Sequence, residues 1–394
     1  MKQSEYLEGK DFSLVLGGPF FQLLSKVHLT GKTLELLKLR VVLLSMIAWL
    51  PLLLLSIANG QAWGNNLSLP FIKDFDVHIR FLLTLPLFII AELVVHQRML
   101  VVVNQFRIRE LIPEPAVVQF QKAISSALRL RNAVIAEVLM LVIIYVIGYK
   151  FIWHESIALD TPTWYSESAV GKGQLSWAGI WFRYISLPLF QFLFLRWYYR
   201  IFIWARFLFQ VSRIELRLVP SHPDHVGGLG FLTNSIYAFM PLALAHGAML
   251  AGMLSNHIFY EGAKLLDFKV VIIIIVVIVM CLAILPLFSF SSQLADVKRI
   301  GSLHYGKLAC HYVQQFENRY IKGTPVDNAT ISNEIQSLAD LSNSYKIVEG
   351  MQFVPVTKSM IIMLVVITLV PVFPLVLTMM PLSDLIKMLA GVLF

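Results

Sequence analysis

Long runs of apolar residues alternate with shorter polar segments along most of the chain. A helix needs about 20 residues to cross a bilayer, and seven apolar runs approach that length. These runs cover residues 40–58, 78–96, 133–152, 177–197, 233–256, 269–290 and 358–380. None alternates like a barrel strand, and in lipid the backbone polar groups must pair internally. The pattern predicts an all-α fold, a polytopic transmembrane helix bundle of about seven spans.

Helical sequence also continues outside the predicted spans. The fourth span runs on without glycine or proline to about Leu218, so this helix is expected to extend beyond the bilayer. Residues 116–131 and 291–322 have helical spacing, and Gly323-Thr-Pro ends the second segment. A short amphipathic helix is expected at about 331–343. Together these segments predict helices that extend into the cytoplasm.

This pattern divides the chain into four segments. Residues 1–39 form a cytoplasmic amphipathic leader, and 40–290 hold spans one to six with helical cytoplasmic loops. Residues 291–357 form a cytoplasmic helical segment, and 358–394 hold the last span and an external C-terminal tail. In the leader, Pro19 precedes apolar residues at helical spacing, which predicts a helix on the inner leaflet or against a neighbouring subunit.

Composition and charge place this bundle in a membrane and orient it. Of the 394 residues, 57% are apolar and 14% are charged, which is unlike a soluble domain. Basic residues gather in the N-terminal segment and in every second loop, so the N-terminus is expected in the cytoplasm and the C-terminus outside. The net charge of +8 then lies beside anionic membrane lipid, and no nucleic-acid partner is needed to explain it.

A few ionisable side chains lie inside the predicted spans, where burial is costly and function is the first hypothesis. Glu92 and His96 are four residues apart and share a helix face. Glu137 enters the third span near the depth of Glu92, and His246 lies deep in the fifth. These four residues are the candidates for transport or for a proton relay.

The polar turn before the fifth span carries a second group of candidates. His222, Asp224 and His225 are predicted to lie on the same side of the membrane as Glu92 and His96. One hypothesis is that these five residues and Glu137 form a cluster of carboxylate and imidazole groups. Such a cluster would bind a divalent metal (Zn, Mn or Fe) or relay protons. In the alternative, Glu92 pairs with His96, the turn caps its two helices, and Glu137 binds a nearby arginine, either Arg129 or Arg131.

Three glycines follow the histidines of this turn. Gly227, Gly228 and Gly230 do not form a dinucleotide-binding motif, because the position that needs the third glycine of that motif is Thr233. They do not form a phosphate-binding loop either, because its lysine is absent. They expose backbone amides to an anion, act as a hinge for the fifth span, or allow a tight re-entry into the bilayer.

The turn sequence His222-Pro-Asp-His-Val-Gly-Gly-Leu-Gly-Phe-Leu232 resembles a motif in bacterial multi-pass inner-membrane proteins of unassigned activity. The likeness extends to Gly17-Gly-Pro19, to residues 77–81 and to residues 128–132. This resemblance implies a bacterial inner (plasma) membrane setting and says nothing about a substrate.

Three functions from different classes fit the sequence. The first is a channel or transporter for an ion or small solute, with a polar site near the cytoplasmic leaflet and a homo-oligomeric assembly. A membrane metalloenzyme acting on a lipid or lipid-linked substrate is the second. A structural or partner-binding membrane subunit is the third.

Overall fold

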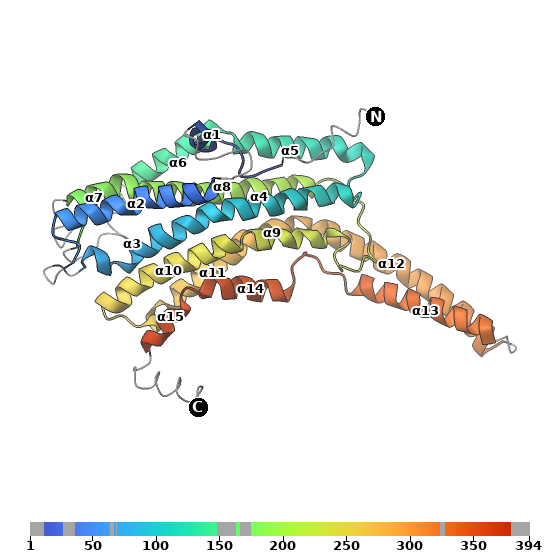
Figure 1. The fold of residues 1–394 in the computed structure, drawn as a ribbon. Coiled ribbons are helices and arrows are strands. Elements are labelled where there is room, and N and C mark those ends of the chain that lie inside the picture. Colours follow the sequence, from blue (N-terminus) through green and yellow to red (C-terminus); the bar gives the residue numbers. More distant parts are fainter. Residues whose placement is uncertain are drawn as a thin grey trace.

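Helices account for nearly all the secondary structure of this chain. The computed structural model describes residues 12–26, 36–63, 67, 69–147, 163–165, 175–323 and 328–379. In these residues the one element outside the helices is an isolated parallel bridge between Leu69 and Thr163. Most helices lie side by side along one direction of the molecule (Figure 1). The all-α prediction is confirmed.

Five stretches of continuous helix among the described residues are long and apolar enough to cross a membrane. They are α2 (Leu37–Ala58), α3 and α4 (Phe75–Ile108), α7 and α8 (Trp177–Val211), α9 and α10 (Leu229–Tyr260), and α11 and α12 (Leu265–Ile321). Two shorter apolar helices, Val134–Val146 and Lys358–Leu369, fall at the predicted third and seventh spans. The five long stretches fit a multi-pass membrane protein.

Two of the long stretches contain a π-helical turn near their first residues. Between α3 (Phe75–Ile79) and α4 (Leu85–Ile108) the turn covers Arg80–Thr84. Between α7 (Trp177–Trp181) and α8 (Leu187–Val211) it covers Phe182–Ser186. Each π turn precedes a proline near the start of the next α-helix, and this proline has no N–H to donate to the preceding turn.

Helix α8, which corresponds to the fourth predicted span, is shorter than the sequence predicts. It ends at Val211 and not near Leu218, so its extension is seven residues shorter. The Ser212 hydroxyl donates to the Phe209 carbonyl, and the Arg217 N–H donates to the Leu111 carbonyl. The chain therefore leaves the helix to pair with the segment after α4, a tertiary contact that helix propensity does not encode.

The α12–α13 hairpin projects beyond the other helices (Figure 1). The sixth span and the following segment are one helical stretch, in which α11 (Lys269–Ile284) continues through a 3₁₀ turn into α12 (Ser291–Phe316). The second arm, α13, covers Asn328–Glu349 and is longer than the predicted 331–343. Packing against α12 supports this extra length, since an isolated helix of about 13 residues is marginal in water.

The last apolar segment is broken and not continuous over 358–380. Helix α14 (Lys358–Leu369) ends before Pro371, and α15 (Phe373–Val376) follows. Proline cannot donate to the preceding turn, so the helix stops there. The break lies against α10 (Met240–Tyr260), where a Cβ on Gly247 would stand 1.9 Å from the Thr368 carbonyl oxygen. Residues 380–394, which include the predicted tail, lie outside the described residues.

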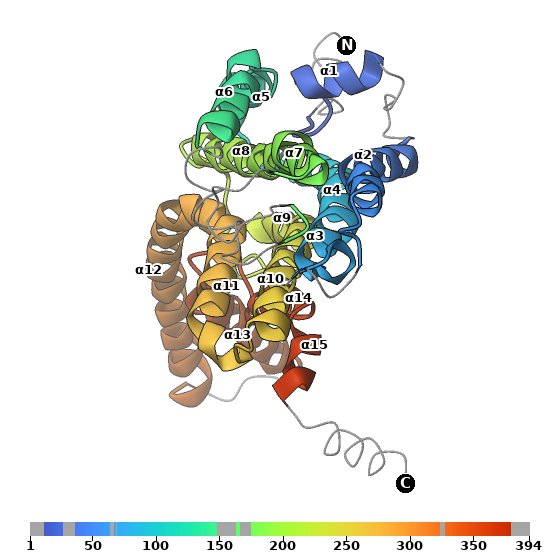
Figure 2. The same cartoon turned by 90° about the vertical axis from the view of Figure 1, so that its left-hand side faces the viewer.

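The described part of the N-terminal segment enters the core. Phe12, Leu14 and Val15 are buried, and the Phe12 ring centroid lies 5.1 Å from that of Phe207 on α8. After this segment comes α1 (Pro19–Lys26), which lies with α5 (Val117–Arg131) and α6 (Val134–Ile147) at one edge of the molecule (Figure 2). The amphipathic helix predicted after Pro19 is present, and residues 12–15, which precede it, are buried inside the protein.

Candidate functional site

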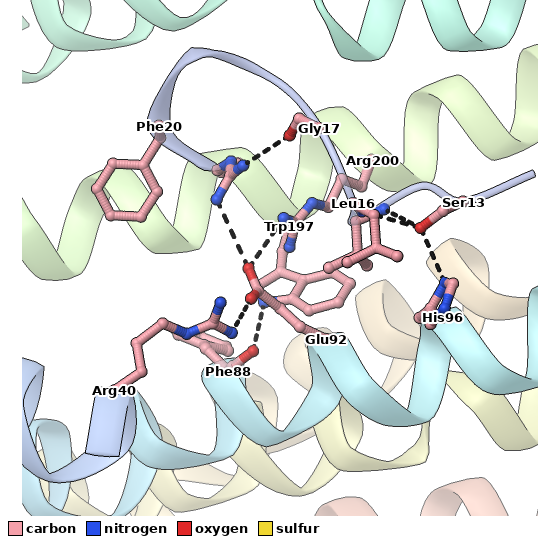
Figure 3. Close-up of polar contacts among 12 residues, drawn as sticks. Ser13, Leu16, Gly17, Phe20, Arg40, Phe88, Glu92, His96, Trp197 and Arg200 are labelled. Atoms are coloured by element: carbon pink, nitrogen blue, oxygen red, sulfur yellow. Dashed lines mark hydrogen bonds and ion pairs between the residues drawn. The ribbon is translucent and has the colours of Figure 1, made fainter. Parts of the chain in front are cut away.

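A buried charge network surrounds Glu92 on α4 (Figure 3). Its carboxylate accepts a hydrogen bond from Arg40 of α2 and lies 2.9 Å from Nη2 of Arg200 on α8. Arg196, one turn earlier on α8, lies 3.6 Å from the same carboxylate. All four side chains are almost fully buried. Two helices, α2 and α8, therefore contact the Glu92 carboxylate of α4 through three arginines.

Glu137 of α6 joins this network to α1. Its Oε1 lies 3.3 Å from Nε of Arg196, and its Oε2 accepts the Phe20 N–H at 2.7 Å. The Gly18 N–H donates to Asn132 Oδ1 at 3.0 Å. The Gly17-Gly-Pro19 and 128–132 motifs thus meet in space. Together with the three arginines and Glu92, Glu137 completes a set of five charges, which we call the Arg–Glu network.

Two of these arginines, Arg40 and Arg200, lie near span ends, where the sequence predicts that basic residues face lipid headgroups. Arg40 and Arg200 are instead 2% and 4% exposed and lie inside the bundle. Arg196 was not singled out at all. One signal was available, because Arg196 and Arg200 are four residues apart and share a face of α8. A buried carboxylate at Glu92 needs such partners.

The alternative pairings expected for the two glutamates do not occur among the described contacts. His96 does not pair with Glu92, and its Nδ1 hydrogen-bonds the Ser13 hydroxyl at 2.9 Å. Arg131 does not pair with Glu137, and it donates to the Ser13 carbonyl at 2.8 Å and to Asn132 Oδ1 at 3.1 Å. Burial, and then the charge of Arg200, lower the pKa of Arg131.

His246 lies apart from the Arg–Glu network, on α10. Its Nδ1 lies 2.7 Å from the Leu242 carbonyl oxygen, which can only accept, so Nδ1 carries the proton. Its Nε2 then accepts from the Tyr198 hydroxyl at 2.9 Å. Phe88 and Phe194 rings pack around the imidazole. The described contacts of His246 are those of a hydrogen-bonded core residue between α8 and α10.

The turn from His222 to Gly230 is organised by the side chain of Asp224. The carboxylate accepts the backbone N–H groups of Val226, Gly228 and Gly230 at 2.8–3.1 Å. His222 Nδ1 lies 2.8 Å from Oδ1 of the same side chain. Burial raises the pKa of Asp224, but the three backbone hydrogen bonds and His222 outweigh it and hold the pKa below its usual value. Asp224 therefore caps the start of the helical stretch that begins at Leu229.

The backbone of this turn explains its glycines. Gly227 and Gly228 have φ of +64° and +100°, and His225 has φ of +56°. A Cβ on Gly230 would stand 2.9 Å from Asp224 Oδ2. Left-handed conformations and this close approach favour glycine. The geometry is that of a tight turn, and both hinge motion and re-entry into the bilayer stay predictions.

The same turn docks the α12–α13 hairpin on the bundle. The His225 carbonyl accepts the Gln352 N–H at 2.7 Å, just after α13. On α12, Gly301 faces Pro220, and the Tyr305 hydroxyl donates to Ser221 at 2.8 Å. The turn therefore connects α8 to the stretch that contains α9 and α10, and it also contacts the α12–α13 hairpin.

The six residues of the sequence-predicted cluster do not converge on one site. Glu92 and Glu137 share Arg196, whereas Asp224 is bound by its own turn. His96 and His225 hydrogen-bond Ser13 and the Ile347 carbonyl, respectively. Over the described part of the chain, no group of three or more His, Cys, Asp or Glu side chains is arranged to hold a metal ion.

Comparison of the chain with protein-family models, curated proteins and solved structures gives no match. The resemblance to bacterial inner-membrane proteins therefore rests on the turn motif and its companion motifs alone.

Proposed function

We propose that this chain is a transporter of a small anion in a bacterial inner membrane, with the Arg–Glu network as its polar site. In this proposal the shorter helices α6 and α14 complete seven spans, with the N-terminus in the cytoplasm and the C-terminus outside. The distribution of basic residues supports this orientation.

The Arg–Glu network is the observation that carries the proposal. Ionisable groups buried within membrane helices are costly and are usually retained for function. Three arginines and two glutamates leave one net positive charge on this buried set. A surplus of guanidinium groups favours an anionic solute over a cation, since arginine offers a planar array of donors to anions.

Arg196 is the residue that we expect to contact the anion. It is shared by Glu92 and Glu137 at 3.6 Å and 3.3 Å, which are the longest ion-pair contacts in the network. Arg200 approaches Glu92 more closely, at 2.9 Å. An entering anion would compete with the two carboxylates for the Arg196 guanidinium, so binding and release of the solute would rearrange this shared contact.

The test is anion uptake into proteoliposomes that contain the purified full-length protein. We expect uptake of chloride or inorganic phosphate above empty liposomes, with no uptake of rubidium. Arg196→Lys keeps the charge but loses the planar donors, so uptake should fall about tenfold. Arg213→Lys, at an exposed position, is the matched control and should transport normally. Absence of anion uptake by the wild-type protein, or uptake of rubidium instead, overturns the proposal.

One observation favours the third function class, a partner-binding subunit, as a second role. The α12–α13 hairpin exposes large apolar side chains, with Leu303 71% and Ile321 70% exposed. Exposed apolar side chains on a projecting hairpin support contact with a second copy of the chain, as in the expected homo-oligomer. Light scattering of the detergent-solubilised protein should give a mass above that of one chain, and Leu303→Lys should lower it. A monomeric mass for the wild type would contradict this role.

A further inference from the structure

An open apolar groove lies between α1, α6 and α8, at the edge of the molecule that Figure 2 shows for α1 and α6. Its volume of about 440 Å³ is in the range of small-ligand sites. Phe20 and Leu23 of α1 form one wall, Val138 and Leu141 of α6 form the second, and Phe192 of α8 contributes to the third. The groove is therefore large enough for part of a hydrocarbon chain.

The groove opens on an apolar surface. Val138 and Leu141 line it and are still exposed, and the neighbouring Ile135 of α6 is 82% exposed. In a protein with five candidate spans, such a surface is suited to contact with lipid and not with water. A lipid chain could thus enter the groove sideways from the bilayer.

One end of the groove is charged. Glu137 lines the groove there, and the Arg196 guanidinium carbon lies 5.0 Å from the Phe20 ring centroid. Arg131, three residues before the groove residue Val134, bonds only neutral oxygen atoms of Ser13 and Asn132 in the described structure. No described carboxylate lies within ion-pair distance of Arg131, so this end carries a surplus of positive charge.

A different contact lies at the opposite end of the groove. The Tyr145 hydroxyl of α6 donates to the Tyr184 carbonyl at 3.1 Å, and both residues line the groove. Between the two ends, Glu137, Val138, Leu141 and Tyr145 follow the spacing of one helix face. The groove therefore has an apolar body and one charged end, where Glu137 lines it and the guanidinium groups of Arg196 and Arg131 lie beside the lining residues.

We propose that this groove binds one acyl chain of an anionic phospholipid from the membrane, with the lipid phosphate at Arg131. Neutral hydrogen-bond partners leave the charge of Arg131 available, and a phosphate is the anion that arginine binds in a bidentate way. The acyl chain then covers Leu141 and Phe192. This inference does not rest on the proposed transport, because a bound lipid is detected without any solute flux.

The experiment uses the full-length protein in phosphatidylcholine vesicles that contain a minor fraction of phosphatidylglycerol with a photoreactive acyl chain. After irradiation, mass spectrometry locates the labelled peptides of α6 and α8. Labelling should be competed by unlabelled phosphatidylglycerol and not by added phosphatidylcholine.

Two matched pairs of variants test the body and the charged end of the groove. Leu141→Trp fills the groove and should reduce labelling about tenfold, whereas Leu139→Trp, on the same helix but outside the groove, should label like wild type. Arg131→Gln should remove the preference for phosphatidylglycerol, whereas the exposed Arg129→Gln should keep it.

Equal labelling of the Leu141→Trp and Leu139→Trp proteins would overturn the groove as the binding site. Equal competition by the two lipids in wild type would overturn the recognition of the anionic headgroup. Arg131→Gln retains an intact groove, so its competition profile tests the proposal even where Leu141→Trp lowers the yield of folded protein.

Discussion

Glu92 and Asp224 are both carboxylates held by several donors, but their partners come from different parts of the chain. Glu92 is bound by three guanidinium groups from α2 and α8, at positions up to 108 residues away in the sequence. Asp224 is bound by backbone N–H groups that follow it within six residues. One carboxylate links distant helices, and the other shapes its own loop.

This difference teaches how each charge is stabilised. At Glu92 the charge is balanced by opposite charges, so removing the carboxylate leaves buried guanidinium groups without their partner. At Asp224 the charge is stabilised mainly by neutral backbone dipoles, with His222 beside it, so removing it chiefly leaves unsatisfied N–H groups. We therefore expect the two sites to respond to substitution with different magnitudes and with a different pH dependence.

The largest effect is expected for Glu92→Gln. The change keeps the shape of the side chain but removes the negative charge among Arg40, Arg196 and Arg200, which should lower the free energy of unfolding by about 3–5 kcal/mol. Denaturant unfolding in detergent micelles measures this change in the free energy of unfolding. The exposed Glu114→Gln is the control and should change little. Equal midpoints for the two variants would mean that the Arg–Glu network does not stabilise the bundle.

A smaller effect is expected for Asp224→Ala, which removes the acceptor of three backbone N–H groups and should cost about 1–3 kcal/mol. Asp224→Asn keeps one oxygen acceptor and should lie between the alanine variant and wild type. Denaturant midpoints measure these differences, and an Asp224→Ala protein with the wild-type midpoint would contradict a stabilising role of Asp224.

The pH dependence at Asp224 follows from its lowered pKa. Because the folded pKa lies below the usual 3.8, the ionised group stabilises the fold above that value and loses this contribution as the pH falls through the folded pKa. The stability difference between wild type and Asp224→Asn should therefore stay constant above about pH 5 and shrink as the pH falls below about pH 4. A difference that grows on acidification would contradict this assignment.

The smallest effect is expected in a pair of glycine substitutions with opposite signs. Gly228→Ala places a Cβ at φ +100° and should destabilise the protein by about 1 kcal/mol. Gly306→Ala lies inside α12, where the nearest side-chain atom is 3.7 Å from the new Cβ, and should stabilise by about 0.5–1 kcal/mol. Thermal unfolding would show midpoint shifts in opposite directions, and shifts of the same sign would argue against the described turn.

The sequence predicted the helical class and the positions of the apolar segments, because bilayer-length runs and helix periodicity are local properties. It also predicted α5 from its spacing, and of the two helix caps expected from the turn, the contacts of Asp224 match only the one at the start of the following helical stretch. Helix ends were predicted less well. The end at Val211 depends on the pairing of Arg217 with Leu111, and the length of α13 depends on its packing against α12.

The partners of the charged residues in the Arg–Glu network were decided by the tertiary structure alone. Glu92 and Glu137 were recognisable from the sequence as unusual residues in apolar helices, since a buried carboxylate is costly wherever it occurs. Their joint partner Arg196 was not, because positive charges near span ends are equally expected at lipid headgroups. Only the packing of α2, α4, α6 and α8 brings these arginines and carboxylates together, and Coulomb attraction in a buried site then selects the pairs.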